Sequence, residues 1–216
     1  MRPNGSTQYG SLARFFHWAV ALLVVATIPL AWTMLNLRSG PTQDLLFTIH
    51  QSIGLTIFAL VVLRLAWRSA NPPPPLPASV SPVQARLARL NHWLLYLVLV
   101  LMPVSGYLSV TAGGYPLSFF GLFDVPRLVA KGKSLAHLTE ATHLALQYVI
   151  YALVVLHVAA ALHHHWVKHD SVLRRMWPGR AGARRIEAIS EPASSRPSTS
   201  LRMRMNSMWH HRLTSS

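Results

Sequence analysis

The chain has 216 residues and contains no cysteine. Thiolate zinc sites, cysteine-ligated iron–sulfur clusters, covalently attached c-type haem and disulfides are therefore all excluded as contributions from this chain. If the chain holds a redox cofactor, the ligands must be other side chains, such as histidine, methionine or tyrosine.

Acidic residues are also scarce: six Asp and Glu stand against twenty Lys and Arg, a formal net charge of +14. Charged residues make up only 12% of the chain and hydrophobic residues 51%, a balance typical of proteins that cross a membrane several times. In a soluble protein the positive charge would favour nucleic acid as a partner. Here much of it lies beside or beyond the apolar segments, so we expect a lipid bilayer as the partner and no nucleic acid.

Four apolar segments are long enough to cross a hydrocarbon core of about 30 Å as helices. Lipid offers the backbone no hydrogen-bond partners, so each segment must be helical. The segments are residues 15–35, 48–67, 92–111 and 143–165. The sequence therefore predicts an all-α fold, an integral membrane four-helix bundle with antiparallel neighbours.

The connecting segments differ in character. Residues 71–82 are rich in proline and predict an extended connector, followed by a short amphipathic lead-in at 83–90. The connector between the third and fourth segments combines glycine and proline with several phenylalanines, which indicates a folded interfacial loop long enough to cap a cofactor. After residue 178 the composition is basic without apolar periodicity, so we expect one domain at 9–178 and a disordered basic cytoplasmic tail at 179–216.

Lys and Arg near the segment ends predict the orientation. The richer side should be cytoplasmic, which places both termini in the cytoplasm and turns the loops near Gly40 and Phe120 outward, to the periplasm of a bacterium. The richer set comprises Arg2, Arg14, Arg64, Arg68, Arg86, Arg89, Lys168, Arg174 and Arg175, and the poorer set Arg38, Arg127, Lys131 and Lys133.

Twelve histidines are many for a chain of this length, and a polar side chain inside a bilayer marks function by default. His17 lies early in the first segment, which begins inside, and His50 lies early in the second, which begins outside. The fourth segment carries His143 and His157, fourteen residues apart, which is close to four turns and about 21 Å along one helix face. The depths therefore match in pairs: His17 with His157, and His50 with His143.

Two histidines on facing helices at one depth are what bis-imidazole ligation of haem requires. We therefore expect an iron-bearing cofactor at each depth, with the fourth helix between the first and second. The alternative role for any one of these histidines is hydrogen-bonded packing. His92 has no evident partner and favours such packing, while His137 is the competitor for the outer ligand. A cluster near the end of the fourth segment favours an interfacial basic cap over a metal site; it comprises His163, His164, His165 and His169.

Several motifs in order resemble the bacterial cytochrome b561 family of di-haem membrane proteins, over residues 9–178. The matching stretches are Arg14-Phe15-Phe16-His17-Trp18, Ile49-His50-Gln51-Ser52-Ile53-Gly54, Arg64-Leu65 before the proline-rich connector, Pro103-Val104-Ser105-Gly106, the His143 to His157 spacing, and Leu173-Arg174-Arg175-Met176. The resemblance implies four helices, two haem b groups per chain and His17, His50, His143 and His157 as the iron ligands.

The resemblance also implies electron transport in a bacterial inner membrane. Family members carry electrons between a donor and quinone, some oxidise superoxide and reduce ubiquinone, and relatives are membrane subunits of hydrogenases and formate dehydrogenases. We therefore expect a respiratory-chain oxidoreductase that passes electrons from superoxide or a redox protein to the quinone pool. The alternatives are a non-catalytic, haem-bearing anchor subunit of a dehydrogenase or hydrogenase and, in a third class, a haem-free transporter or metal-handling protein.

Two groups of cations have two interpretations each. Arg127, Lys131 and Lys133 in the outer loop either attract an anion such as superoxide or form a solvated loop face. Arg64 and Arg68 at the inner end of the second segment either pair with haem propionates or anchor the helix.

Overall fold

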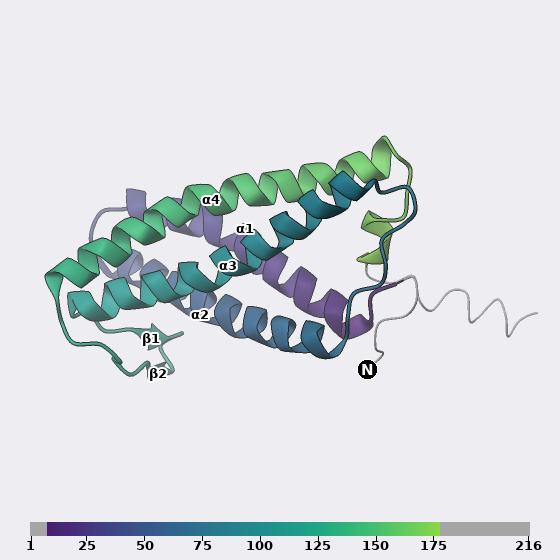
Figure 1. Cartoon of the computed structure of the whole chain (residues 1–216). Coiled ribbons are helices and arrows are strands. Elements are labelled where there is room, and N and C mark those ends of the chain that lie inside the picture. The colour runs from purple at the N-terminus through teal and green to yellow at the C-terminus, as the bar shows by residue number, and fades with distance from the viewer. Residues whose placement is uncertain (1–7, 178–216) are drawn as a thin grey trace, which may run out of the picture. The chain divides into compact units, whose positions relative to one another are not determined.

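The computed structural model describes residues 8–177 (Figure 1). In chain order the helices and strands are α1 (Ser11–Asn36), α2 (Pro41–Ala70), α3 (Pro82–Gly113), β1 (Ser118–Phe119), β2 (Phe123–Asp124), α4 (Lys133–Trp166) and the short 3-10 helix η1 (Leu173–Arg175). All four α-helices are long enough and apolar enough to cross a membrane. The predicted four-helix membrane fold is therefore confirmed, and the expected tail at 179–216 lies outside the described residues.

Each helix is longer than the apolar segment that predicted it. The lead-in at 83–90 is part of α3, because Ser81 and Gln84 form a capping box that starts the helix at Pro82. At the other end Gly114 adopts a left-handed conformation, φ 89°, and ends α3. Hydropathy therefore locates the part of a helix inside the hydrocarbon, whereas capping residues decide where the helix begins and ends.

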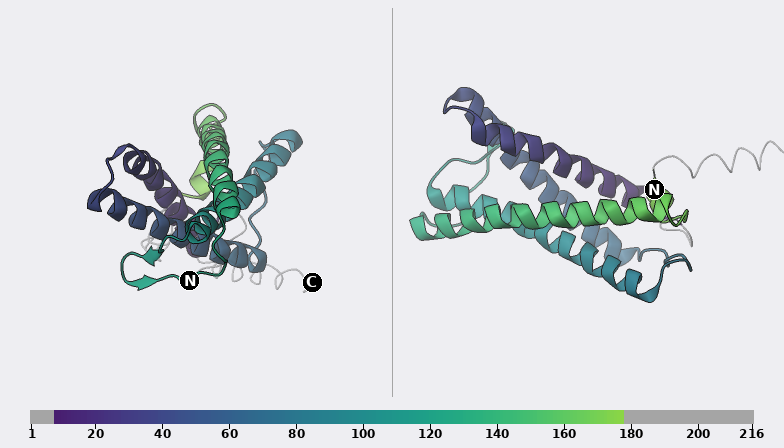
Figure 2. Two further views of the ribbon diagram at one scale, coloured as in Figure 1. Left: turned by 90° about the vertical axis from the view of Figure 1, so that its left-hand side faces the viewer. Right: turned by 90° about the horizontal axis from the view of Figure 1, so that it is seen from above.

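Neighbouring helices pack in sequence order, α1 on α2, α2 on α3 and α3 along α4 (Figures 1 and 2). No Cα atom of α4 lies within 8 Å of a Cα atom of α1 or α2. The expectation that the fourth helix lies between the first two is therefore wrong for the backbone, because α4 packs on α3. Where α4 faces α1 and α2, the helices are too far apart for direct backbone packing.

The buried core is small and apolar, formed by Val20, Val24, Ile57, Val61, Tyr96, Val98 and Ile150. Many large apolar side chains lie outside it, and Leu22, Trp32 and Val155 are 66%, 70% and 67% exposed. Such a surface would promote aggregation in water, whereas in a bilayer it contacts lipid tails.

The β1–β2 hairpin lies beside α2 near one end of the bundle, which we call the hairpin end (Figure 1). Its antiparallel register pairs Ser118 with Asp124 and Phe119 with Phe123. The fully buried Ser52 of α2 holds it in place: the Ser52 hydroxyl accepts a hydrogen bond from the Phe120 amide at 2.7 Å and donates one to the Thr48 carbonyl at 2.6 Å. The connector between α3 and α4 is therefore folded against α2, in agreement with the folded loop that the sequence predicts.

The opposite end, which we call the η1 end, is tied by residues distant in sequence. The Trp18 indole donates to the Met176 carbonyl at 2.8 Å, and the Arg14 guanidinium donates to the Trp177 carbonyl at 3.0 Å. The segment that follows α4 thus holds the beginning of α1. Two of the motif stretches quoted above, near residues 14–18 and 173–176, therefore lie together in space.

Candidate functional site

The four histidines predicted as ligands lie in two pairs inside the bundle. The ring centroids of His50 and His143 are 6.2 Å apart, and we call these residues the hairpin-end pair. The ring centroids of His17 and His157 are 6.1 Å apart and form the η1-end pair. Helix α4 contributes one histidine to each pair, and the partners come from α2 and α1. The structure thus brings the four residues together in the two combinations that depth predicted.

The spacing of both pairs suits one metal ion between two imidazoles. An imidazole nitrogen binds a transition metal at about 2 Å, so two rings on opposite sides of one ion have centroids roughly 6 Å apart. Two neutral imidazoles are also the donor set of a low-spin, bis-histidine haem. The donor set and its spacing therefore fit haem iron.

His143 is held in the tautomer that a ligand needs. Its Nδ1 atom lies 2.9 Å from the Met102 carbonyl oxygen, and the Ser105 hydroxyl is 3.3 Å away. A carbonyl oxygen can only accept, so Nδ1 carries the proton and donates it. The lone pair is then on Nε2, which is free to coordinate a metal.

Gly106 of α3 allows the His143 ring to lie where it does. A Cβ atom at this position would be 3.1 Å from two atoms of that ring, closer than ordinary van der Waals contact. The absence of a side chain therefore lets α3 and the imidazole approach each other. This contact gives a structural reason for the glycine in the Pro103-Val104-Ser105-Gly106 stretch.

A cavity of about 250 Å³ opens beside the hairpin-end pair, and both histidines line it. Gly54 lies on its wall, where an added Cβ would meet nothing within 4 Å. The buried Nδ1 of His50 has no hydrogen-bond partner among the described residues, which is costly in apolar surroundings. A mostly apolar cavity with two imidazoles, one of them unsatisfied, fits a flat iron-bearing cofactor.

The η1-end pair has a neighbour that the sequence did not indicate. The His92 ring centroid of α3 lies 5.2 Å from that of His157, although the sequence shows no evident partner for His92. The contact follows from the direct packing of α3 on α4. The antiparallel register of α3 and α4 could have predicted this contact. Met102 of α3 lies beside His143 of α4, and His92 precedes Met102 while His157 follows His143, so His92 and His157 lie toward the same end of the bundle.

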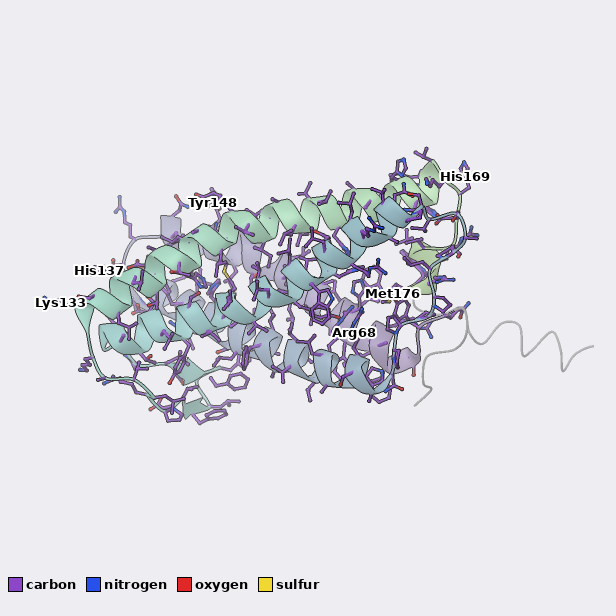
Figure 3. All side chains as sticks on the ribbon, in the orientation of Figure 1. Arg68, Lys133, His137, Tyr148, His169 and Met176 are labelled. Atoms are coloured by element: carbon purple, nitrogen blue, oxygen red, sulfur yellow. The ribbon has the colours of Figure 1, made fainter. Side chains whose placement is uncertain are left out.

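His137, the competing outer ligand, faces away from the pairs. It lies in α4, not outside the helix, and its side chain is 80% exposed, with Nδ1 4.0 Å from Glu140 (Figure 3). Its position therefore favours His143 over His137 as the partner of His50.

The histidine cluster that ends α4 forms an ion-pair contact. Within residues 8–177, no three His, Cys, Asp or Glu side chains are grouped so that they could hold a metal ion. His164 Nδ1 lies 2.5 Å from the Asp170 carboxylate, which also accepts from the Ser79 hydroxyl and the Val172 amide. Burial raises the pKa of Asp170, but the hydrogen bonds from Val172, His164 and Ser79 outweigh it and hold this pKa below its ordinary value.

Two of the three outer-loop cations lie at the end of α3. Arg127 donates to the Gly114 carbonyl at 3.4 Å, and the Lys131 side chain is 3.1 Å from where a Cβ of Gly114 would be. The C-terminus of a helix carries partial negative charge, which these cations complement. Lys133 is the first residue of α4, at the same end (Figure 3). At least Arg127 and Lys131 thus have a structural role beside any effect on an anion.

Comparison with known proteins identifies the family. The family model described as prokaryotic cytochrome b561 matches residues 8–179. The chain is 37% identical over 181 residues to cytochrome b561 homolog 2 of Escherichia coli K12, covering 80% of this chain and 93% of that protein. It is 34% identical over 178 residues to the probable superoxide oxidase CybB of Yersinia pestis, covering 81% of this chain and 98% of that protein.

A third relative, cytochrome b561 homolog 1 of Escherichia coli K12, is 28% identical over 177 residues, covering 77% of this chain and 94% of that protein. The match extends over nearly the whole length of each relative, and the family model covers all four membrane helices of this chain. The chain therefore belongs to the prokaryotic cytochrome b561 family, and it is a bacterial membrane cytochrome that binds haem b.

Proposed function

We propose that the chain is a di-haem electron carrier, with one haem b at the hairpin-end pair and a second at the η1-end pair. The observation that carries this proposal is the spacing on α4: His143 and His157 are fourteen residues apart, and each faces one histidine of another helix at about 6 Å. When bound, haem b supplies reversible one-electron chemistry at its iron.

The contribution of the protein is to bind and orient the haems and to insulate them. The two imidazoles of each pair would hold the haem iron and would leave no position for a substrate there, so the haem would supply outer-sphere electron transfer. The Met102 carbonyl holds the His143 ring in position, and a donated hydrogen bond of this kind raises the basicity of the ligand. Ser52 fastens the hairpin to α2 at the hairpin end.

We propose that the hairpin end faces the periplasm and that both termini are cytoplasmic. The excess of Lys and Arg around the η1 end supports this orientation. Electrons then enter at the hairpin-end pair and leave near the η1-end pair, about 21 Å further along α4.

We propose superoxide as the donor and quinone as the acceptor, which the similarity to a probable superoxide oxidase supports. Two superoxide ions each lose one electron and become dioxygen. One quinone takes up the two electrons and two protons and becomes quinol. The alternative is a haem-bearing anchor subunit, which would co-purify with a larger dehydrogenase or hydrogenase.

A pyridine haemochrome assay on the purified full chain tests the haem count. We expect two haems b per chain. A stoichiometry of one or none would overturn the di-haem proposal.

Salt dependence of the reduction rate tests the donor. Superoxide is an anion, so its association should be steered by the hairpin-end cations and slow as salt shortens the Debye length, which is about 8 Å at physiological strength. Changing Arg127, Lys131 and Lys133 together to Gln should lower this rate and flatten its salt dependence with both haem spectra unaltered. The exposed Arg86 and Arg89, changed to Gln, remove charge from the η1 end and serve as the control. Equal, salt-independent rates in all proteins would shift the proposal to a protein donor.

A further inference from the structure

Helix α2 presents one face to the interior along its whole length. Residues at intervals of three and four follow this face, and the series is His50, Gly54, Ile57, Val61, Arg64 and Arg68. Gly54 and Ile57 line the hairpin-end cavity, and Val61 is completely buried. The face that carries a histidine at the hairpin end therefore carries two arginines at the η1 end.

The depth of Arg64 matches that of the η1-end pair. Arg64 follows His50 by fourteen residues on α2, just as His157 follows His143 by fourteen on α4. Both helices begin at the hairpin end and run in the same direction (Figure 1). Since His50 and His143 face each other, the equal translation places Arg64 at the level of His157.

Both arginines are held in the bundle by one buried tyrosine. Arg64 Nε donates to the Tyr96 hydroxyl at 2.9 Å, and its guanidinium carbon lies 5.7 Å from the centre of the Tyr96 ring. The guanidinium carbon of Arg68 is 5.9 Å from the same ring centre. Tyr96 is 8% exposed and comes from α3. Both cations are thus held against an interior tyrosine, which disfavours the simple helix-anchor interpretation. Figure 3 shows Arg68 at this end of the bundle, near Met176.

Neither arginine has a carboxylate partner within residues 8–177, where the ion pairs are His137–Glu140 and His164–Asp170. A small cavity lies between Arg64, Arg68 and Tyr96, and Trp67 also lines it. The buried Nε1 of Trp67 has no hydrogen-bond partner among the described residues. Several donors without an acidic acceptor at the edge of a membrane core call for an anionic, oxygen-rich group.

We propose that Arg64 and Arg68 bind the propionate carboxylates of the haem held by His17 and His157, with Tyr96 as the positioning residue for Arg64. The proposal rests on the proposed function, since it requires a haem at the η1 end. A guanidinium matches a carboxylate through two parallel hydrogen bonds. The residues that line the hairpin-end cavity include no Lys or Arg, so the two arginines distinguish the η1-end haem site from the hairpin-end site.

A redox titration of the purified full chain, followed by its optical spectrum, tests the proposal. A nearby cation disfavours the oxidised iron, which carries one more positive charge, so Arg64→Gln and Arg68→Gln should each lower the midpoint potential of the η1-end haem. The hairpin-end haem should keep its potential. His143→Ala and His157→Ala identify which component of the titration belongs to which site.

Three further variants make the result specific. Arg64→Lys should recover part of the shift because it keeps the charge without the bidentate geometry, and Tyr96→Phe should shift the same haem by less. Arg86→Gln, a cation on the exposed surface of α3, should shift neither. Selective loss of the η1-end haem from Arg64→Gln also supports the proposal. If Arg64→Gln loses both haems, the midpoint potentials of the Arg64→Lys and Tyr96→Phe variants test the proposal in its place.

A phosphate of a lipid headgroup is the other source of an anion for this site. The titrations are therefore repeated in vesicles of phosphatidylcholine alone and of phosphatidylcholine mixed with anionic phosphatidylglycerol. The same shift in both supports the propionate, and a shift only with phosphatidylglycerol assigns the arginines to lipid. Two haems with unchanged potentials in Arg64→Gln and Arg68→Gln overturn this proposal alone, whereas a wild-type chain with one haem overturns the di-haem function.

Discussion

The two ends of the bundle hold histidine pairs of nearly equal spacing in different surroundings. At the hairpin end, His143 donates to a backbone carbonyl, Gly106 gives its ring space, and the cavity wall has no Lys or Arg. At the η1 end, His157 has a second imidazole, His92, beside it, and Arg64 lies at its depth. Helix α4 thus contributes one histidine to each pair, and the other helices make the surroundings of the two pairs unequal.

The difference in charge bears on the direction of electron flow. Cations favour the reduced state of a nearby iron, so the arginine-flanked site should have the higher potential if its propionates leave a net positive field. An electron that enters at the hairpin end would then move to the η1 end with a favourable change in free energy. Both ends share α4, so variants that act on one end alone can test how independent they are.

The largest expected effect is the loss of one haem from a single ligand variant. His157→Ala should remove the η1-end haem and leave much of the hairpin-end haem. The haem bound by His17 would then lack the second histidine at the same depth, which α4 provides. His143→Ala should do the reverse. Pyridine haemochrome content and the two optical components measure the outcome. Equal loss of both haems from a folded His157→Ala protein would contradict the pairing.

A smaller, graded effect is expected from bulk at Gly106. Gly106→Val places methyl groups where even a Cβ lies only 3.1 Å from the His143 ring, so the imidazole must shift and the hairpin-end haem should be partly lost. Gly132→Ala is the control, because its Cβ meets nothing within 4 Å. Haem content and the component of the spectrum from each site are the measurements. An η1-end loss in Gly106→Val would show that the two ends are coupled.

Ser52→Ala should loosen the hairpin without removing a ligand. The Phe120 amide loses its buried acceptor, and an unsatisfied buried group costs about 1 to 3 kcal/mol. Hydrogen–deuterium exchange should increase in residues 117–125 and stay unchanged at the η1 end. Thr56→Ala removes only a bond within α2, from Thr56 to the Ser52 carbonyl, and is the matched control. Protection equal to that of wild type would show that Ser52 does not fasten the hairpin.

The smallest effect is expected from Asp170→Asn at the η1 end, and it is a loss of stability that depends on pH. Folding lowers the pKa of Asp170, so its contribution to stability is present above the pKa of the unfolded carboxyl and is lost as pH falls through the folded pKa. The variant should therefore have a lower melting temperature than wild type at neutral pH, and the difference should shrink in acid below about pH 4. A constant difference at all pH values would exclude the ionised carboxylate as the cause.

The helices and the histidine depths were predictable from the sequence for simple reasons. Hydropathy finds the membrane segments because lipid demands about twenty apolar residues in a helix. The interval from His143 to His157 fixes a common face because the helical repeat is regular. Helix ends were less predictable: the capping box at Ser81 and the left-handed Gly114 lie outside the apolar segments.

Contacts between helices were harder to predict, as His92 and Arg64 illustrate. The sequence showed no partner for His92 and left two roles open for Arg64, a haem propionate partner or a helix anchor. The structure places His92 beside His157, and it holds Arg64 against Tyr96. Both contacts depend on how α3 is rotated against α2 and α4. A membrane helix that is apolar on nearly every side carries little information about that rotation.

The sequence by itself thus determined the number of membrane helices, the depth of each histidine and the absence of any thiolate ligand, because these follow from composition and helical repeat. Only the tertiary structure decided that α4 rests on α3, that Gly106 lies against His143 and that both arginines lie against Tyr96. The physical reason is that lipid makes every membrane segment helical, whereas close contacts between particular side chains select which helix faces meet.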